Sequence, residues 1–249
     1  MSRSSGSLSS VNELRALLEA GGAPPEYLDR LVTYGGAVLE ANRQFNLTGA
    51  KTAADFAPHI LDSLSIAAQV RDSLVDVGSG GGLPAIPLAI VTGVPVTLIE
   101  TTVKKARFLE RMLAELGLAG AVVAERAEVA GHDARLREGF PTGTARAVAS
   151  APTVVELLLP FVAVGGQALL QRGTIDEHER HALTDAALML GGLVESETLL
   201  EGERRVIVVR KTGPTPSRFP RRTGVPEKRP LCSDPRERDG LEKPAKERT

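Results

Sequence analysis

Two different hydrophobic periods divide this chain. Over the first 70 residues, apolar positions recur every three or four residues, the period of amphipathic helices. The pattern predicts helices from about residue 10 to 20, from about 25 to 42 and from about 53 to 70. Ser10 followed by Glu13 is typical of a capping box, and Gly21-Gly22 ends the first helix. Residues 1–70 are therefore predicted to form a helical segment.

Beyond residue 70, short β-branched runs alternate with longer amphipathic stretches. We expect strands at 74–77, 95–100, 121–124, 145–149, 166–171, 193–199 and 204–211, with helices at about 83–92, 102–117, 126–137, 153–162 and 175–190. Alternation of this kind predicts an α/β fold: a seven-stranded, mostly parallel sheet with helices on both faces. Only four residues separate the last two strands, so these should form an antiparallel hairpin.

The chain after Lys211 has a different composition, dominated by proline and charge. We divide the sequence into a helical segment (1–70), an α/β domain (71–212) and a basic, Pro-rich C-terminal tail (213–249). The tail is expected to be extended or disordered, at least after about residue 230. Residues 204–249 hold 14 basic and 6 acidic residues, net +8, although the whole chain carries −1. This asymmetry fits either a contact with a polyanion or a solvated end.

The amino-acid composition excludes several kinds of functional site. A single cysteine, Cys232, excludes an internal disulfide and a cysteine-rich zinc site, and the four histidines follow no metal-ligand spacing. No run of 18 apolar residues exists, and the N-terminal residues lack the apolar centre of a signal peptide. We therefore predict a cytoplasmic protein without a metal site or a membrane contact.

The stretch "LVDVGSGGGLPAIPLAI", residues 74–90, carries the first functional signal. A buried strand runs into a glycine-rich turn and then a helix, which places backbone N–H groups at the carboxyl edge of the sheet. Gly78 and Gly80 match the first two glycines of G-x-G-x-x-G, but Leu83 occupies the third position. The motif is weak alone, and no Gly-Lys-Ser/Thr follows to make a P-loop.

Glu100 ends the second predicted strand, twenty residues after Gly80. A carboxylate there can accept two hydrogen bonds from a ribose diol. The alternative is a helix-capping acid, because a helix is expected just beyond. Loop and acid together indicate an adenosine-containing cofactor, either a dinucleotide or S-adenosylmethionine.

Six segments occur in an order that closely resembles the RsmG (GidB) family of bacterial methyltransferases: "NLTGAK" (46–51), "HILDSL" (59–64), "DVGSGGGLPAIPLAI" (76–90), "LIETTVKKARFL" (98–109), "ERAEVA" (125–130) and "ARAVASAPTVVELLLP" (145–160). The resemblance runs from about residue 10 to about 230. It implies a class I, Rossmann-like methyltransferase fold, S-adenosylmethionine as cofactor, and methylation of N7 of a guanine in small-subunit (16S) ribosomal RNA.

The resemblance also assigns residues to the cofactor. Gly78, Gly80 and Leu83 would contact its methionine and adenosine parts, Glu100 its ribose, Thr101 and Thr102 its adenosine, Ala127 and Glu128 its adenine, and Arg146 would face the methyl-transfer pocket. Three departures stand out: Ala85 replaces a common glycine, Ala145 a common serine, and "QRG" at 171–173 a common lysine-glycine. Arg172 keeps the charge of that lysine but not its geometry.

Guanine N7 carries a lone pair, so no proton must leave before attack and we assign no catalytic base. His59 and Asp62 share a helix face, and their role stays open between a packing pair and active residues. The segment with Arg210 and Lys211 suits phosphate contact, with Phe219 as the ring available for stacking. The cations expected to bind RNA are Arg218, Arg221, Arg222, Lys228 and Arg229.

Two alternatives remain at this point. An NAD-binding oxidoreductase of Rossmann type would share the loop and Glu100, although Leu83 and the predicted hairpin disfavour it. A non-enzymatic RNA-binding protein would use the basic tail alone. For the methyltransferase we expect a monomer that acts on small-subunit RNA or a 30S particle. Truncation after Arg210 is expected to weaken RNA binding and to leave cofactor binding intact.

Overall fold

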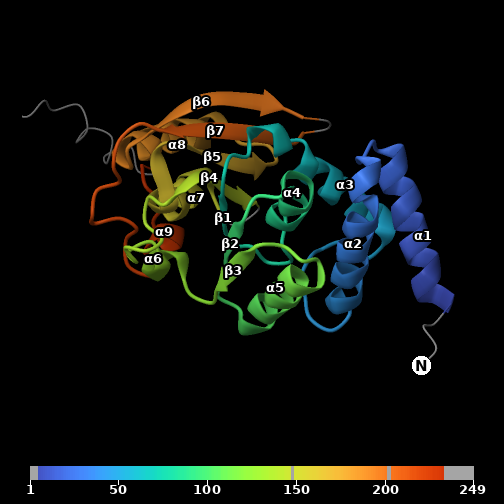
Figure 1. Cartoon of the computed structure of the whole chain (residues 1–249). Helices are drawn as coiled ribbons and strands as arrows, with labels where there is room; N and C mark the ends of the chain where they lie inside the picture. The colour runs from blue at the N-terminus through green and yellow to red at the C-terminus, as the bar shows by residue number, and fades with distance from the viewer. Residues whose placement is uncertain (1–4, 147–148, 201–202, 233–249) are drawn as a thin grey trace, which may run out of the picture. The chain divides into compact units, whose positions relative to one another are not determined.

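The computed structural model describes residues 5–146, 149–200 and 203–232. Internal contacts divide the chain into two compact units, Met1–Glu125 and Arg126–Thr249, each described below by itself (Figure 1). Seven strands lie within the described residues, in the order β3-β2-β1-β4-β5-β7-β6. The expected seven-stranded, mostly parallel sheet with an antiparallel end is confirmed.

The first unit begins with three helices, α1 (Ser5–Ala20), α2 (Leu28–Asn42) and α3 (Ala53–Leu64), with short 3-10 turns at Pro25–Tyr27 and Ala67–Gln69. Helix α1 packs against α2 and α3 (Figure 1). The predicted capping box at Ser10 is wrong, because α1 begins five residues earlier. A capping box lies instead at the start of α3, where Thr52 and Asp55 each accept the other's backbone N–H.

Three parallel strands follow in the first unit: β1 (Leu74–Val77), β2 (Val96–Ile99) and β3 (Gly120–Val123), separated by helices α4 (Ala85–Thr92) and α5 (Val103–Glu115). All four residues of β1 are buried, as the apolar run predicts for a strand covered on both faces. In register, Val77 pairs with Ile99. The glycine loop and Glu100 therefore leave neighbouring strands at the same edge of the sheet.

The second unit contains α6 (Ala127–Ala130), β4 (Phe140–Arg146), α7 (Ala151–Leu158), a 3-10 turn (Leu159–Phe161), β5 (Val162–Arg172), α8 (Glu177–Met189), β6 (Gly192–Leu199), β7 (Arg205–Lys211) and α9 (Val225–Lys228). Strand β4 is parallel to β5, and β7 is antiparallel to both β5 and β6. The predicted terminal hairpin is confirmed.

The helix predicted for 126–137 is wrong, because α6 ends at Ala130. The residues beyond it form turns, and Glu138 adopts a positive φ of 50°. Arg137 and Glu138 use their side chains to hold residues 212–232. Long-range hydrogen bonds therefore take the place of the helix that the local pattern favours.

We call residues 212–232 the C-terminal segment. It is largely without regular structure, yet Phe219, Leu231 and Cys232 are buried. These residues are thus packed into the second unit. The expected disorder concerns the chain after about residue 230 and stays a prediction. Residues 233–249 of the expected tail lie outside the described residues. The predicted division into three domains stays a prediction.

No helix among the described residues is long and apolar enough to cross a membrane. The same part of the chain holds no group of three or more His, Cys, Asp or Glu side chains placed to bind a metal ion.

Candidate active site

The glycine loop links β1 to α4 with an unusual backbone. Gly78, Gly80 and Gly82 have φ values of 72°, 54° and 99°, in the left-handed region that favours glycine. Gly82 also lacks room for a side chain, since a Cβ there would lie 2.5 Å from Ile86 Cγ1. Gly81 has neither constraint, because its Cβ would meet Leu47 at an ordinary 3.6 Å. Three of the four glycines are therefore required by the backbone itself.

Glu100 is held beside this loop by two backbone amides. Gly80 N donates to Oε2 at 2.9 Å, and Thr102 N donates to Oε1 at 2.7 Å. The residue is 6% exposed. A carboxylate offers about four lone-pair positions, so each oxygen keeps one for another donor. The two sequence interpretations are compatible: the acid braces the start of α5 and still presents two acceptors, as a ribose diol needs.

The N-terminal helices support the glycine loop from behind. The buried Tyr34 of α2 donates its hydroxyl to Gly81 O at 2.9 Å. Leu47, in the loop after α2, packs against Gly81. Leu83 is half-buried at the end of the loop, while Thr101 and Thr102 are exposed before α5. The predicted cofactor residues of the first unit thus come together around one loop.

In the second unit, Ala127 and Glu128 lie on the short helix α6, and both are buried. Glu128 Oε1 accepts a hydrogen bond from Gly224 N at 2.8 Å. Gly224 belongs to the C-terminal segment and has a φ of 76°. The predicted adenine-binding residue is therefore connected directly to the C-terminal segment, a link that no sequence signal indicated.

Arg146 is half-buried at the carboxyl end of β4, in register with Gln171 of β5. The next residue of β5, Arg172, donates to Ala149 O at 2.7 Å and to Glu179 Oε1 at 2.9 Å. Burial lowers the pKa of Arg172, and the nearby Glu179 carboxylate partly offsets this. Arg172 therefore holds Ala149, at the start of the chain leading into α7.

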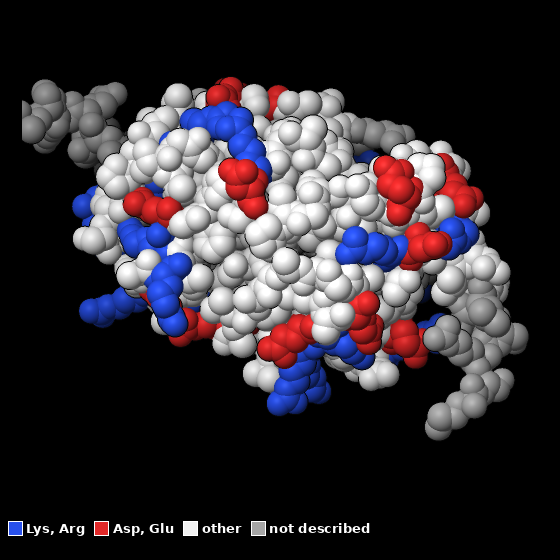
Figure 2. Space-filling view, viewed as in Figure 1, with Lys and Arg blue, Asp and Glu red and all other residues white. Residues whose placement is uncertain are grey.

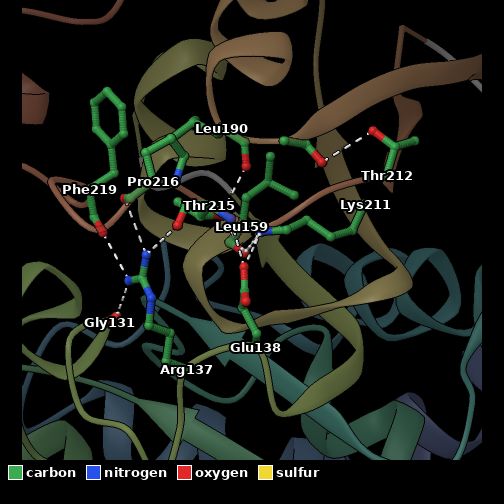
Figure 3. Close-up of polar contacts among 11 residues, drawn as sticks. Gly131, Arg137, Glu138, Leu159, Leu190, Lys211, Thr212, Thr215, Pro216 and Phe219 are labelled. Atoms are coloured by element: carbon green, nitrogen blue, oxygen red, sulfur yellow. Dashed lines mark hydrogen bonds and ion pairs between the residues drawn. The ribbon is translucent and has the colours of Figure 1, made fainter.

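A partly buried polar cluster anchors the start of the C-terminal segment (Figure 3). Arg137 donates to four backbone carbonyls, those of Gly131 (2.7 Å), Thr215 (2.8 Å), Phe219 (2.9 Å) and Pro216 (3.2 Å). Beside it, Glu138 accepts from Thr215 N at 2.7 Å and pairs with Lys211 Nζ at 3.2 Å. A guanidinium with five donors suits this task better than an ammonium.

Lys211 is fully buried, so the expectation that it contacts phosphate is wrong. Its ammonium donates to Leu159 O at 2.9 Å and to the Thr215 hydroxyl. Burial lowers the pKa of Lys211 to about 8, although the ion pair with Glu138 opposes the change. Burial alone would raise the pKa of Glu138, but hydrogen bonds from Thr215 and Lys211 outweigh this and lower it. Arg210 pairs with Glu195 at 2.7 Å.

The predicted RNA-binding cations divide into two groups. Arg221 pairs with the fully buried Glu156 through Nε and a terminal nitrogen, at 2.9 and 2.7 Å. The other four are exposed: Arg218, Arg222, Lys228 and Arg229. Phe219 is 2% exposed, so the expectation that its ring stacks on a base is wrong. Figure 2 shows basic and acidic side chains interspersed over one face of the molecule.

His59 and Asp62 lie on one face of α3, as the spacing predicts. Asp62 is buried, and the half-buried His59 contacts the edge of the Phe56 ring at 6.2 Å between centroids. These contacts belong to the helical packing of the first unit.

The fold and the loop define a class of protein: an α/β enzyme that binds a nucleoside cofactor at the carboxyl edge of its sheet. Solved structures of other proteins share this fold. A ribosomal protein L11 methylase from Lactobacillus delbrueckii subsp. bulgaricus aligns with a TM-score of 0.50 at 16% identity, over 63% of this chain and 80% of its own. A branched-chain polyamine synthase from Thermus thermophilus gives 0.52 at 13% identity, over 64% and 57%.

Sequence comparison identifies the family. Residues 27–208 match the GidB family model, rRNA small subunit methyltransferase G. A ribosomal RNA small subunit methyltransferase G from Chloroflexus aggregans is 40% identical over 82% of this chain and 87% of its own. Its counterpart from Rubrobacter xylanophilus is 39% identical, over 87% and 89%. The chain belongs to this family, and is thus an S-adenosylmethionine-dependent methyltransferase of small-subunit ribosomal RNA. These findings disfavour the NAD-binding oxidoreductase.

Proposed function

We propose that this methyltransferase modifies N7 of a guanine in small-subunit ribosomal RNA. The proposal rests on the six motifs from "NLTGAK" to "ARAVASAPTVVELLLP", in which the chain resembles the guanine-N7 enzymes. Both acids of the predicted cofactor site, Glu100 and Glu128, accept hydrogen bonds from backbone N–H groups. We assign neither as a general base, because N7 carries a lone pair and no proton and therefore needs none.

The residues of the site fit S-adenosylmethionine. Close approach to a backbone requires a loop without side chains, and Gly78 and Gly80 provide it. Glu100 keeps two acceptors for a diol. When bound, S-adenosylmethionine supplies an electrophilic methyl group on a sulfonium.

The chain's part in the reaction is positioning. We assign Leu83, Thr101 and Thr102 to the border of the cofactor, and Ala127 and Glu128 to its adenine. We assign Arg146 to placing the cofactor or the guanine. Alignment of reacting atoms contributes most where no proton transfer is needed, and a cationic product gains from nearby acceptors.

We propose that Arg218, Arg222, Lys228 and Arg229 bind the RNA backbone. Their exposure on a segment held by partly buried hydrogen bonds supports this. Changing Arg222 to Gln should weaken RNA binding and reduce its salt dependence by about one counterion. Arg221→Gln should instead lower the melting temperature, because it leaves the Glu156 carboxylate buried without its partner.

We further propose that the enzyme is a cytoplasmic monomer. Small-subunit RNA, free or within a 30S particle, is its proposed substrate. Transfer rates on deproteinised RNA and on isolated 30S particles would distinguish the two, and light scattering coupled to size exclusion would measure the molecular mass in solution.

The N7 assignment is tested by mass mapping of small-subunit RNA from a strain that lacks the gene. N7-methylguanosine should disappear at one position and return with the wild-type gene. Glu100→Ala and Arg146→Ala should fail to restore it. Unchanged N7-methylguanosine in the deletion strain would refute the assignment.

A further inference from the structure

A pocket of about 330 Å³ lies in the first unit, between the end of α2 and the loop that leads to α3. Five of its seven lining residues have polar side chains, and two of these are cationic: the lining is Leu39, Asn42, Arg43, Asn46, Thr48, Gly49 and Lys51. The volume is at the lower end of the range for small-molecule sites. None of these residues belongs to the cofactor site described above.

The walls of the pocket are fixed by the side chain of Asn42. Its Oδ1 accepts from Leu47 N at 2.8 Å and from Thr48 N at 3.0 Å, and its Nδ2 donates to Ala50 O at 2.8 Å. The capping box at Thr52 fixes the other end of the loop. The pocket is therefore formed before any ligand binds.

The pocket adjoins the glycine loop. Leu47 packs its backbone carbonyl and Cβ against Gly81, each 3.6 Å from where a Cβ on Gly81 would lie. The residues on either side of Leu47, Asn46 and Thr48, line the pocket. One residue thus separates the cofactor-binding loop from the pocket.

The lining suits one nucleotide of a single strand. Arg43 and Lys51 are exposed cations that can pair with a phosphate, and Asn46 and Thr48 offer amide and hydroxyl groups to a base or ribose. Arg43 pairs with Glu40 at 3.0 Å, but both side chains are exposed, so a phosphate can replace Glu40 at little cost.

We propose that this pocket binds a nucleotide of the substrate RNA that flanks the target guanine, with its phosphate on Arg43 and Lys51. The proposal rests on the RNA methyltransferase function above and adds the place where the strand enters. It makes Asn46 and Lys51 positioning residues for the RNA, distinct from the residues assigned to S-adenosylmethionine.

Gly49 offers a way to fill the pocket without disturbing its walls. A Cβ there meets nothing within 4 Å, and its φ lies outside the left-handed region. Gly49→Leu should fill the pocket and weaken binding of transcribed small-subunit RNA by about tenfold or more, which corresponds to about 1.4 kcal/mol. Gly49→Ala, the matched control, should bind nearly as wild type. Lys51→Gln should reduce the salt dependence by about one counterion, whereas Arg15→Gln on α1 should not.

Three measurements on each variant test the proposal: RNA affinity, affinity for S-adenosylhomocysteine and melting temperature. Affinity for S-adenosylhomocysteine and melting temperature should be unchanged in every variant. RNA affinity of Gly49→Leu equal to wild type would overturn the proposal, as would a parallel loss of S-adenosylhomocysteine binding. Tight binding of GMP or inorganic phosphate, lost in Gly49→Leu while RNA affinity persists, would also overturn it. The titration needs no methyl transfer, so failure of the N7 assignment would be seen separately, in the mass mapping.

Discussion

The glycine loop and the C-terminal segment differ in which part of the chain makes the contacts: the backbone in the loop, and side chains in the segment. In the loop, the backbone itself makes the key contacts: Gly78, Gly80 and Gly82 adopt positive φ, and the N–H of Gly80 donates to Glu100. In the C-terminal segment, side chains from elsewhere hold an irregular backbone, as when Arg137 binds four carbonyls.

The difference shows where sequence patterns are informative. The partners in the loop are close in sequence, since Glu100 follows Gly80 by twenty residues, and strand periodicity sets the geometry between them. Arg137 and Phe219 are 82 residues apart, and Arg221 and Glu156 are 65 apart. A spacing of that kind has no period that a single sequence can reveal.

The same contrast explains where prediction from the sequence fails. The predicted helix over 126–137 has the right local composition, but Arg137 and Glu138 gain more from long-range hydrogen bonds than from helix formation. Proline and charge dominate the tail, a composition that favours an extended or disordered chain. Burial of Phe219, Leu231 and Cys232 overrides that composition. Conversely, six of the seven strands and the terminal hairpin are predictable, because β-branched runs and a short connection determine them locally. The strand predicted at 145–149 is wrong: β4 spans 140–146, where Pro141 and Gly143 hide it from a pattern of β-branched residues.

The largest expected effect comes from truncation after Arg210. The sequence alone favoured intact cofactor binding in such a variant, but the structure makes the segment part of the folded second unit. Loss of Arg221 leaves Glu156 buried, and breaking one such pair costs about 3–5 kcal/mol. Loss of the buried Phe219 and Leu231 side chains destabilises the folded state further. The melting temperature should fall by roughly 10 °C or more.

Truncation after Cys232 is the matched control and should melt as the full chain does. Calorimetry of both proteins makes the comparison. If the chain ending at Arg210 keeps the wild-type melting temperature, the C-terminal segment is not an integral part of the fold.

Lys211 should give the second unit a pH dependence. Its folded-state pKa of about 8 lies below the ordinary 10.5, so between these values the unfolded chain binds more protons. The free energy of unfolding should therefore rise with pH in that window, by at most about 3 kcal/mol. Below pH 8 the lysine is protonated in both the folded and the unfolded state, and the free energy of unfolding stays at its lower value.

The comparison is between wild type and Lys211→Met, by urea denaturation at pH 7.5, 9 and 10.5. The difference in free energy of unfolding between the two proteins should change with pH as the lysine loses its proton. Parallel pH profiles would show that Lys211 does not titrate in this range.

A smaller effect should separate two neighbouring glycines. Gly82→Ala forces a side chain into a positive φ and against Ile86, and should cost about 1–3 kcal/mol of stability. Gly81→Ala meets Leu47 at an ordinary distance and should cost much less. Denaturation of both variants measures the difference. Equal losses at the two positions would mean that the loop does not depend on the conformation described.

The central claim is that the glycine loop and Glu100 together bind S-adenosylmethionine. Calorimetric titration with S-adenosylhomocysteine tests it most directly, on wild type, Glu100→Gln and Glu100→Ala. Wild type should bind, Glu100→Gln should bind at least about tenfold more weakly, and Glu100→Ala more weakly still, with NAD giving no heat. Unchanged affinity in Glu100→Ala, or tight binding of NAD without S-adenosylhomocysteine, would contradict the account.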